Sequence, residues 1–565
     1  MLVEASHDRV VGSLVAFETQ QGGNDVICVG QITRVELRNR WHEDSVFRNL
    51  IKRSGEIPPI TNRQDTRMAK LAVGATFKKH TDSGQKGFEP DVLGMVPPTG
   101  TRIFRVNQDL LSMLLLAYQQ EIFYLGRAYA NEVFLPMWLK HFGAGEGGAG
   151  EAYHMGIFGK TGSGKSGLAK MILVGYARHP QMGILIIDPQ GEFSLEVQGT
   201  RVGQQGLDVD GMLRVLGREV RRYAISDIQL EEWDMFEDLL VTLKFTEQLG
   251  IPSASKDNCR KAAEVVRKAL QNKKYKLEGL EQEECLRQSL RAVSQNAEYI
   301  YSTQARADQL KQRVQEIESQ ENELNDLLQQ YWQPITGLFA GRQGRRRLYG
   351  IVDDLMRPVE GHRARPIVVI DISDRGNQQL WSEELQQRIL LRLLHILINR
   401  SKKTLADKTT ANVLVILDEA HRHAPSGFIE HGTQAEMLRA HLRTATRETR
   451  KYGVGWCFIS QTLGGLDDEI IPQLRILFLG FGLALGEEFR RLREFIGGDD
   501  RAMELYQSFR DPQSFPSREL QEFPFMVVGP VSPLSFSGRP MFFTAFTNPE
   551  EFMKVNNIDQ QRGSP

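Results

Sequence analysis

A glycine-rich segment has the composition of a phosphate-binding loop. Residues 159–166 read GKTGSGKS, which fits the pattern G-x-x-x-x-G-K-[ST]. In such a loop the glycines let backbone N–H groups curl around a phosphate, a lysine reaches the β- and γ-phosphates and a hydroxyl binds Mg²⁺. We therefore expect Lys165 to bind the terminal phosphates and Ser166 to bind the metal. The expected nucleotide contacts in this loop are Gly159, Lys160, Thr161, Gly162, Ser163, Gly164, Lys165 and Ser166.

Two adjacent carboxylates end a strongly apolar run. Residues 413–417 read VLVIL and are followed directly by Asp418 and Glu419. Downstream of a phosphate loop, one such carboxylate can hold Mg²⁺ through water while the other orients and deprotonates an attacking water. We predict the metal role for Asp418 and the catalytic role for Glu419. The alternative is that the pair only caps the next helix.

Other polar residues follow apolar runs in the same way. Asp188 comes after ILII (184–187) and could support the nucleotide or the metal, although D-P-x-G is also a good turn sequence. Gln461 follows WCFI (456–459) and could sense the γ-phosphate or the attacking water, or could simply be a polar strand end. Asp371 ends a further run in a similar position.

Two arginine clusters could contact phosphates. Arg439, Arg443, Arg447 and Arg450 are spaced by four, four and three residues, which places them on one helix face. An arginine presented to a neighbouring subunit's phosphate is worth 10³–10⁵ in rate. Arg447 and Arg450 are the candidates for this catalytic role, and the alternative is a solvated face balanced by acidic neighbours. The second cluster, within residues 342–347, could contact DNA or pair with acidic side chains.

The elements that must position these residues have an α/β pattern. Several short apolar runs are near-continuous rather than alternating, as expected for parallel strands that are buried on both faces. Helical stretches separate them, which indicates a layered fold with a mainly parallel sheet. The runs are 155–158, 184–187, 367–370, 413–417, 456–459 and 476–481.

Changes in composition divide the chain into segments. The N-terminal region is rich in strand formers, and the residues after position 205 are rich in Glu, Gln, Lys, Arg and Leu with helical spacing. The expected segments are an N-terminal β-domain at 1–130, either a small barrel or a sandwich, a glycine-rich linker at 131–152, an α/β core at 153–205 and 351–511, an inserted helical subdomain at 206–350 and a C-terminal tail at 512–565.

Composition also limits the function classes. The chain has 565 residues, with 70 Lys and Arg against 71 Asp and Glu, so any DNA contact must come from a local basic patch or a pore. Four scattered cysteines without a C-x-x-C pattern argue against a zinc module. His421 and His423 have no Cys or acidic ligand cluster nearby in the sequence, so we do not expect a metal site at these histidines.

The N-terminus lacks the apolar core of a signal peptide and no apolar stretch approaches membrane length, so we expect a cytoplasmic protein with no membrane contact.

The motif series resembles the HerA family of hexameric DNA-translocating ATPases. The blocks that carry the resemblance are residues 154–166, 187–193, 370–373, 417–421, 450–455 and 459–461. It implies a RecA-like P-loop NTPase core, an N-terminal HAS barrel and a C-terminal tail that braces a neighbouring subunit. It assigns the P-loop roles to Lys165 and Ser166, the metal and water roles to Asp418 and Glu419, and the sensor role to Gln461. It also implies an arginine of residues 447–450 acting in trans.

The resemblance further implies ATP and Mg²⁺ as cofactors and a homo-hexamer around double-stranded DNA. Its partner would be a NurA-like nuclease, or another effector such as a sirtuin-like NAD-consuming enzyme in anti-phage defence. We therefore expect an ATP hydrolase that acts as a DNA translocase or helicase in DNA end processing or defence. The alternatives are an ATP-dependent ring scaffold that activates an effector, and a protein-pumping ATPase of the conjugative secretion type.

Overall fold

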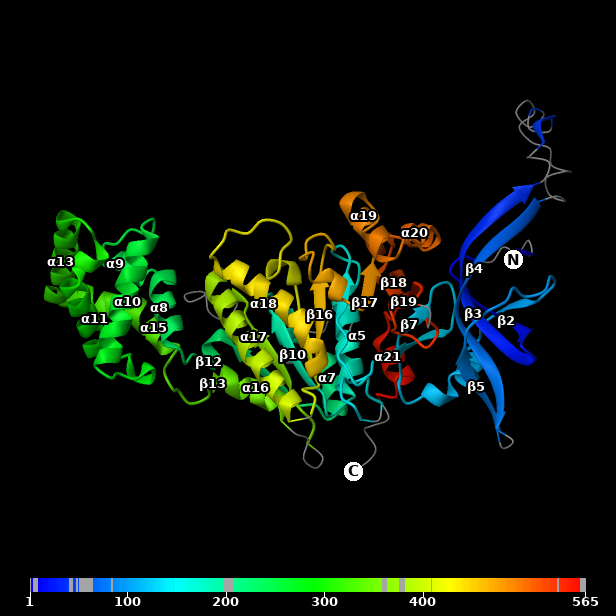
Figure 1. The fold of residues 1–565 in the computed structure, drawn as a ribbon, viewed down its shortest axis with the longest axis horizontal. Helices are drawn as coiled ribbons and strands as arrows, with labels where there is room; N and C mark the ends of the chain where they lie inside the picture. The colour runs from blue at the N-terminus through cyan, green and yellow to red at the C-terminus, as the bar shows by residue number, and fades with distance from the viewer. Residues whose placement is uncertain are drawn as a thin grey trace.

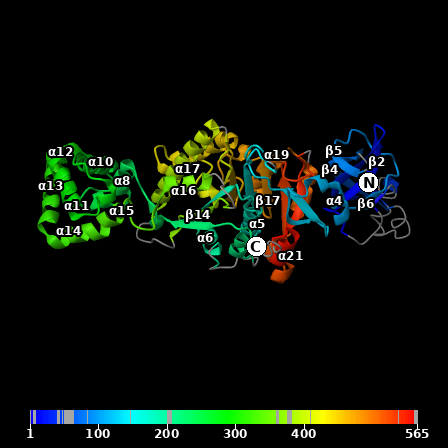
Figure 2. The same cartoon turned by 90° about the horizontal axis from the view of Figure 1, so that it is seen from below.

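The computed structural model describes residues 2–3, 9–39, 44–46, 49, 65–82, 85–145, 147–197, 199, 207–357, 363–374, 382–407, 409–535 and 538–558. These residues form three parts that lie in a row (Figures 1 and 2). An N-terminal sheet is at one end, a central α/β structure is in the middle and a helical subdomain is at the other end.

The N-terminal part is an antiparallel sheet. Its β2–β3 hairpin turns at Gly22 and Gly23, whose φ angles of 58° and 80° suit the twist of a tight hairpin. Among the described strands, β1 and β6 at the two ends of the sheet do not pair, so the expected barrel takes the form of an open half-barrel. The strand order is β1 (Leu2–Val3), β4 (Asp65–Asp82), β3 (Asn24–Asn39), β2 (Leu14–Gln21) and β6 (Ile103–Arg105), with β5 (Gln85–Asp91) paired to β4.

The central sheet has eleven strands in the described part of the chain. Seven neighbouring strands are parallel, six of them at the predicted apolar runs, and four antiparallel strands extend the sheet. The parallel strands, in spatial order, are β11 (Val220–Ala224), β14 (Ile367–Asp371), β10 (Gly183–Asp188), β15 (Val413–Leu417), β16 (Val454–Ser460), β9 (Met155–Phe158) and β17 (Ile476–Gly480). The antiparallel strands that follow are β18 (Phe523–Val528), β19 (Met541–Ala545), β7 (Ile122–Ala128) and β8 (Phe134–Trp138).

Helices cover both faces of the parallel strands. Along β10, Leu185 and Ile187 pack into one apolar core while Ile184 and Ile186 pack into another, which explains why the whole run is apolar. The first core includes α16 (Leu348–Met356), α17 (Glu383–Ala406) and α18 (Gln434–Glu448). The second includes α5 (Lys165–Ala177) and α7 (Val209–Val215).

The helical subdomain has an aromatic centre. Trp332 is fully buried, its ring lies 5.8 Å from Phe236 and 5.3 Å from Phe245, and its indole N–H donates to the Leu280 carbonyl oxygen at 2.8 Å.

The helical subdomain begins later than the expected residue 206, because residues 207–224 supply α7 and β11 to the core. Its helices are α8 (Trp233–Thr242), α9 (Phe245–Gln248), α10 (Lys256–Asn272), α11 (Glu283–Gln295), α12 (Ala297–Ile300), α13 (Gln304–Ser319), α14 (Glu321–Leu327) and α15 (Gln333–Gly337).

Segments from both ends of the sequence complete the central sheet. The β7–β8 hairpin pairs with β19, and a Cβ added to Gly126 would lie only 2.0 Å from the Thr544 carbonyl oxygen. The expected boundary at residue 130 therefore falls inside this hairpin. The C-terminal region contributes α19 (Gly486–Phe495), α20 (Asp500–Gln507) and α21 (Pro549–Val555), together with β18 and β19, which pair within the chain's own sheet.

Candidate nucleotide site

The glycine-rich loop joins β9 to the N-terminus of α5. Gly162 and Gly164 have φ angles of 83° and 88°, which favour glycine. A Cβ on Gly162 would lie 2.4 Å from Gln513 Nε2, and one on Gly164 would lie 2.7 Å from the Phe523 ring. The backbone N–H groups at a helix N-terminus favour an anion at this position. The loop therefore has the conformation that a phosphate-binding loop requires.

The side chain of Lys165 lies over this loop. Its Nζ donates a hydrogen bond to the Lys160 carbonyl oxygen at 3.0 Å. Burial lowers the pKa of Lys165, while the negative charges of Glu419 and Asp418 act in the opposite direction. The buried Ser163 hydroxyl has no hydrogen-bond partner among the described residues. A buried cation and an unpaired hydroxyl both suit an anionic ligand in this loop.

Asp418 and Glu419, the acid pair, directly follow the end of β15. Asp418 is buried, and its Oδ1 accepts a hydrogen bond from the Glu419 N–H at 2.9 Å. Burial, together with the nearby charges of Glu419 and Asp188, raises the pKa of Asp418 to about 7. Glu419 has a φ of 46°, an unfavourable backbone conformation of the kind that clusters at functional sites. The arrangement leaves a buried carboxylate that a cation would stabilise.

Gln461 connects the acid pair to the phosphate loop. It follows β16, which lies between the acid strand β15 and the loop strand β9 in the sheet. Its amide nitrogen donates to Glu419 Oε1 at 3.1 Å, and its amide oxygen accepts from the Thr161 hydroxyl at 3.2 Å. A continuous hydrogen-bonded path therefore runs from the loop to the carboxylate.

Asp188 lies near Asp418 and accepts hydrogen bonds from backbone N–H groups. Its two carboxylate oxygens accept from the Gly191 and Ser194 N–H groups, each at 2.8 Å, so it caps the short helix α6 (Glu192–Glu196). Burial raises the pKa of Asp188. These contacts fit the turn interpretation of the D-P-x-G sequence, while its negative charge still acts on Asp418.

Arg447 and Arg450 lie at the amino edge of the parallel strands, opposite the carboxyl edge that holds the phosphate loop. Arg447 pairs with Glu469 near the C-terminus of α18, and Arg450 makes a two-pronged ion pair with Glu151, which precedes β9. The seven-residue strand β16 starts beside them and ends at Gln461, a separation of about 20 Å. Neither arginine is therefore next to the phosphate loop of its own chain.

Most arginines of the second cluster have acidic partners. In the 342–347 cluster, Arg342 pairs with Glu281 and Arg347 with Glu231 and Glu278. These contacts agree with the ion-pair interpretation, and because both arginines are more than half exposed they do not decide against a phosphate contact. Within the described residues there is no group of three or more His, Cys, Asp or Glu side chains that could hold a metal.

The structure also reveals contacts that the sequence patterns did not indicate. Gln513 and Phe523 belong to the C-terminal segment and lie against the phosphate loop through its glycines. No local pattern marks them, because the contact joins residues about 350 positions apart. In the part of the chain that the structure describes, no helix has the length and apolar character needed to cross a bilayer.

The strand order and the site define a P-loop ATPase fold, with an extra strand between the loop strand and the acid strand. Residues 152–397 match the family model described as helicase HerA, central domain. This segment, a little under half of the chain, is similar to the central domain of HerA helicases. No curated protein matches the chain.

Several solved structures are similar to the chain at low identity. VirB4 of Thermoanaerobacter pseudethanolicus is 15% identical, with a TM-score of 0.37, and the match covers 76% of this chain and 97% of that one. The genome packaging NTPase B204 from Sulfolobus turreted icosahedral virus 2, in complex with ATP-gammaS, is 11% identical over 69% and 96%, with a TM-score of 0.29. The bacterial conjugative coupling protein TrwBdeltaN70 is 10% identical over 70% and 85%, with a TM-score of 0.36. All three scores are below 0.5, so the fold assignment depends on the strand order itself.

Proposed function

We propose that this protein hydrolyses ATP to move along double-stranded DNA as a homo-hexameric ring that works with an effector enzyme. The observation that carries the proposal is the hydrogen-bonded path from Thr161 through Gln461 to Glu419, in a chain whose residues 152–397 match the HerA central domain. Through this path a terminal phosphate in the loop can change the position of the carboxylate that activates water.

Each residue of the site has a role in this reaction. Lys165 neutralises the β- and γ-phosphates, and the loop N–H groups hold them at the start of α5. Glu419 orients and deprotonates the attacking water, and Gln461 fixes the orientation of Glu419. Ser166 and Asp418 would hold Mg²⁺, which when bound neutralises charge on the phosphates. The raised pKa and burial of Asp418 are consistent with a carboxylate that requires a cation.

The position of the arginines supports a ring. Arg447 and Arg450 lie about 20 Å from the phosphate loop of their own chain, so a role at a phosphate requires a neighbouring subunit. A ring that repeats one head-to-tail contact would bring this edge of one subunit towards the next subunit's nucleotide. The chain is nearly neutral, so DNA affinity would come from a few cationic contacts per subunit inside the pore.

The effector partner is part of the proposal. The helical subdomain projects from the core at the end opposite the N-terminal sheet (Figure 1), so the two parts offer separate docking surfaces. A NurA-like nuclease would place the chain in DNA end processing, and a sirtuin-like enzyme would place it in anti-phage defence.

The test is ATP hydrolysis with and without linear duplex DNA, at two salt concentrations. We expect stimulation by DNA that weakens as salt rises. Glu419→Gln should lower the stimulated rate by about 10²–10⁴-fold, because it removes the base, and should leave ATP affinity within a few-fold of wild type. Glu519→Gln is the matched control, since Glu519 is exposed and outside the site. Unchanged hydrolysis in Glu419→Gln would overturn the site, and hydrolysis that DNA never stimulates would favour the scaffold alternative.

A further inference from the structure

A surface rich in cations lies where the helical subdomain joins the central structure. It is formed by two loops: residues 272–276 (NKKYK), at the end of α10, and residues 341–347 (GRQGRRR), which lead into α16. The second loop carries the short strand β13 (Arg346–Arg347), which pairs with β12 (Ile228–Gln229) between the subdomain and the core (Figure 1). We call this the junction surface, and its cations are Lys273, Lys274, Lys276, Arg342, Arg345, Arg346 and Arg347.

The two loops of the junction surface are held side by side by ion pairs. Arg347 binds Glu278 at 2.7 Å and Arg342 binds Glu281, so the second loop is fixed to the residues that directly follow the first. Lys276 lies only two residues before Glu278, in an exposed position. The lysines and the arginines therefore belong to one surface.

The cations of the junction surface outnumber the carboxylates that pair with them. Lys273, Lys274 and Lys276 are exposed and have no ion-pair partner among the described residues. Arg346 reaches Asp354 at 3.9 Å, but two arginines outside the surface bind the same carboxylate. The carboxylates that pair with the surface are Glu231, Glu278, Glu281 and Asp354. Three lysines and four arginines therefore share four carboxylates, in a chain whose total charge is balanced.

Arg345 is a cation of this surface whose charge is not neutralised. Its side chain is half-buried, and its Nη1 has no hydrogen-bond partner among the described residues. Burial lowers the pKa of Arg345 and the nearby charge of Arg342 acts in the same direction, while Glu281 and Asp227 act in the opposite direction. An unpartnered guanidinium beside a second arginine is stabilised by an anion with several oxygen acceptors, such as a phosphate.

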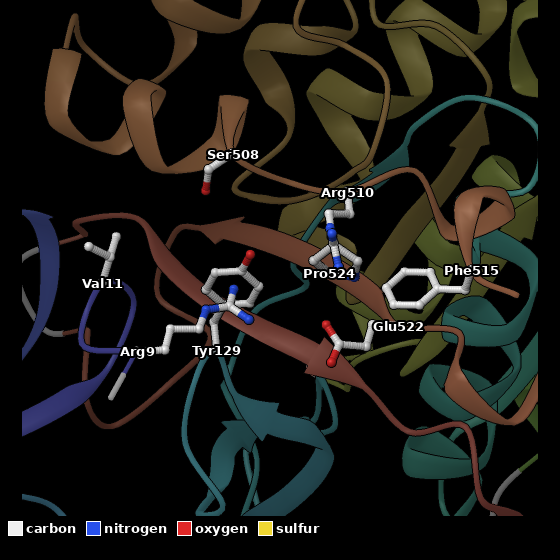
Figure 3. Close-up of a pocket in the computed structure, with 8 residues that line it drawn as sticks. All are labelled: Arg9, Val11, Tyr129, Ser508, Arg510, Phe515, Glu522 and Pro524. Atoms are coloured by element: carbon white, nitrogen blue, oxygen red, sulfur yellow. The ribbon is translucent and has the colours of Figure 1, made fainter. Parts of the chain in front are cut away.

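The pocket in Figure 3 provides a contrast, because it also contains two arginines. There the Arg9 guanidinium lies 4.4 Å from the centre of the Tyr129 ring, and the Arg510 guanidinium lies 5.8 Å from the centre of the Phe515 ring. The Glu522 carboxylate lies between Arg9 and Phe515 (Figure 3). Aromatic faces and a carboxylate already surround these cations, whereas the lysines of the junction surface are exposed to solvent.

We propose that the junction surface binds the phosphate backbone of double-stranded DNA. The proposal rests on the function proposed above for the choice of DNA, but it requires neither ATP nor the phosphate loop. A protein partner would need an apolar centre, and none of the exposed large hydrophobic side chains of the described residues lies in the two loops. The cations instead alternate with the exposed amides of Asn272 and Gln343, which can donate hydrogen bonds to phosphate oxygens.

The test is equilibrium binding of a short linear duplex to the full-length protein without nucleotide, between about 50 and 200 mM salt. The lysine variant combines Lys273→Gln, Lys274→Gln and Lys276→Gln, which removes three charges without breaking an ion pair among the described residues. Three phosphate contacts contribute a slope of about −2.7 to the logarithm of affinity against the logarithm of salt concentration. Over this salt range the fall in affinity should therefore be about 40-fold smaller in the variant than in the wild type, for the contacts of one subunit.

The matched control combines Lys256→Gln, Arg260→Gln and Arg306→Gln. These exposed cations lie near the first turns of α10, about 20 Å from the junction surface, so the control removes the same charge from the same subdomain. The control should keep the wild-type affinity and salt dependence. Replacement of the three lysines of the junction surface by arginine preserves the charge and should also keep both.

The outcomes separate this proposal from the function on which it rests. Unchanged duplex binding by the lysine variant would overturn the junction surface as a DNA site and would leave an acidic protein as the partner that fits it. Equal losses in the lysine variant and the control would also overturn it, because they would reflect the charge of the whole subdomain. ATP hydrolysis tests the function itself: if duplex DNA never stimulates wild-type hydrolysis, the translocase is overturned even where DNA binding depends on the three lysines.

Discussion

Replacing Asp418 by asparagine tests whether the site contains a buried charge that only a cation can stabilise. The carboxylate is 7% exposed, and its pKa is raised from 3.8 to about 7 by burial and by the charges of Glu419 and Asp188. Asparagine keeps the shape and the acceptor for the Glu419 N–H but carries no charge. In the metal-free protein, Asp418→Asn should therefore be more stable than wild type at high pH.

The pH dependence follows from proton binding. Between pH 4 and 7 the native state holds a proton on Asp418 that the unfolded chain releases, so the free energy of unfolding falls as pH rises through this window and is flat above it. About three pKa units at 1.36 kcal/mol each give about 4 kcal/mol as the full effect. The difference between variant and wild type should be near zero at pH 4 and approach this value at pH 8.

The assay is chemical denaturation at pH 5, 6, 7 and 8 in the presence of a chelator. Asp326→Asn is the matched control, because Asp326 is exposed on α14 and its replacement should give no pH-dependent gain. The same Asp418→Asn protein should lose Mg²⁺-dependent ATP hydrolysis. If Asp418→Asn is no more stable than wild type at pH 8 without metal, the reasoning about a buried unpaired charge is wrong.

Two further predictions concern the loop and the core. Gly164→Ala should weaken ATP binding at least tenfold, because a Cβ combines a φ of 88° with a 2.7 Å contact to Phe523; Gly217→Ala, with a φ of 67° and open space, should leave ATP affinity unchanged in the same titration. Asp467→Ala should lower the free energy of unfolding by about 2 kcal/mol, because it removes a buried carboxylate that Arg443 binds at 2.6 and 2.9 Å, although Arg443 keeps Glu469 as a partner. A loss below 0.5 kcal/mol in denaturant titrations would contradict the second prediction.

The parallel strands were predictable because each is buried on both faces. The runs 155–158 and 413–417 match β9 and β15 residue for residue, since a continuous apolar run with polar ends leaves few alternatives. The edge strand β11 was not predicted. It carries Arg221 and Arg222 in place of an apolar run, and Arg222 reaches Asp371 at the end of the neighbouring strand.

The sequence could place individual residues of the candidate site at strand ends, but it could not predict how they are assembled. The sequence indicates that Glu419 and Gln461 each follow a strand, whereas their hydrogen bond depends on β16 lying between β15 and β9. Strand order is a property of the whole sheet and leaves no local pattern. The same reason hides the contacts of Gln513 and Phe523 with the loop, because the segment that holds them is placed by the pairing of β17 with β18.

The two edges of the parallel sheet carry opposite halves of the proposed chemistry. The carboxyl edge holds the loop, the acid pair and Gln461, while the amino edge holds Arg447 and Arg450 with their partners Glu469 and Glu151. Both arginines are about half exposed, so their ion pairs are weak and can be exchanged for a stronger anion at low cost. A triphosphate presented by a neighbouring subunit is such an anion, since a bidentate arginine–phosphate contact is charge-assisted. The rate of hydrolysis in one subunit would then depend on the position of the arginines at the neighbouring subunit's amino edge. Such a dependence would couple conformational changes in neighbouring subunits around a ring.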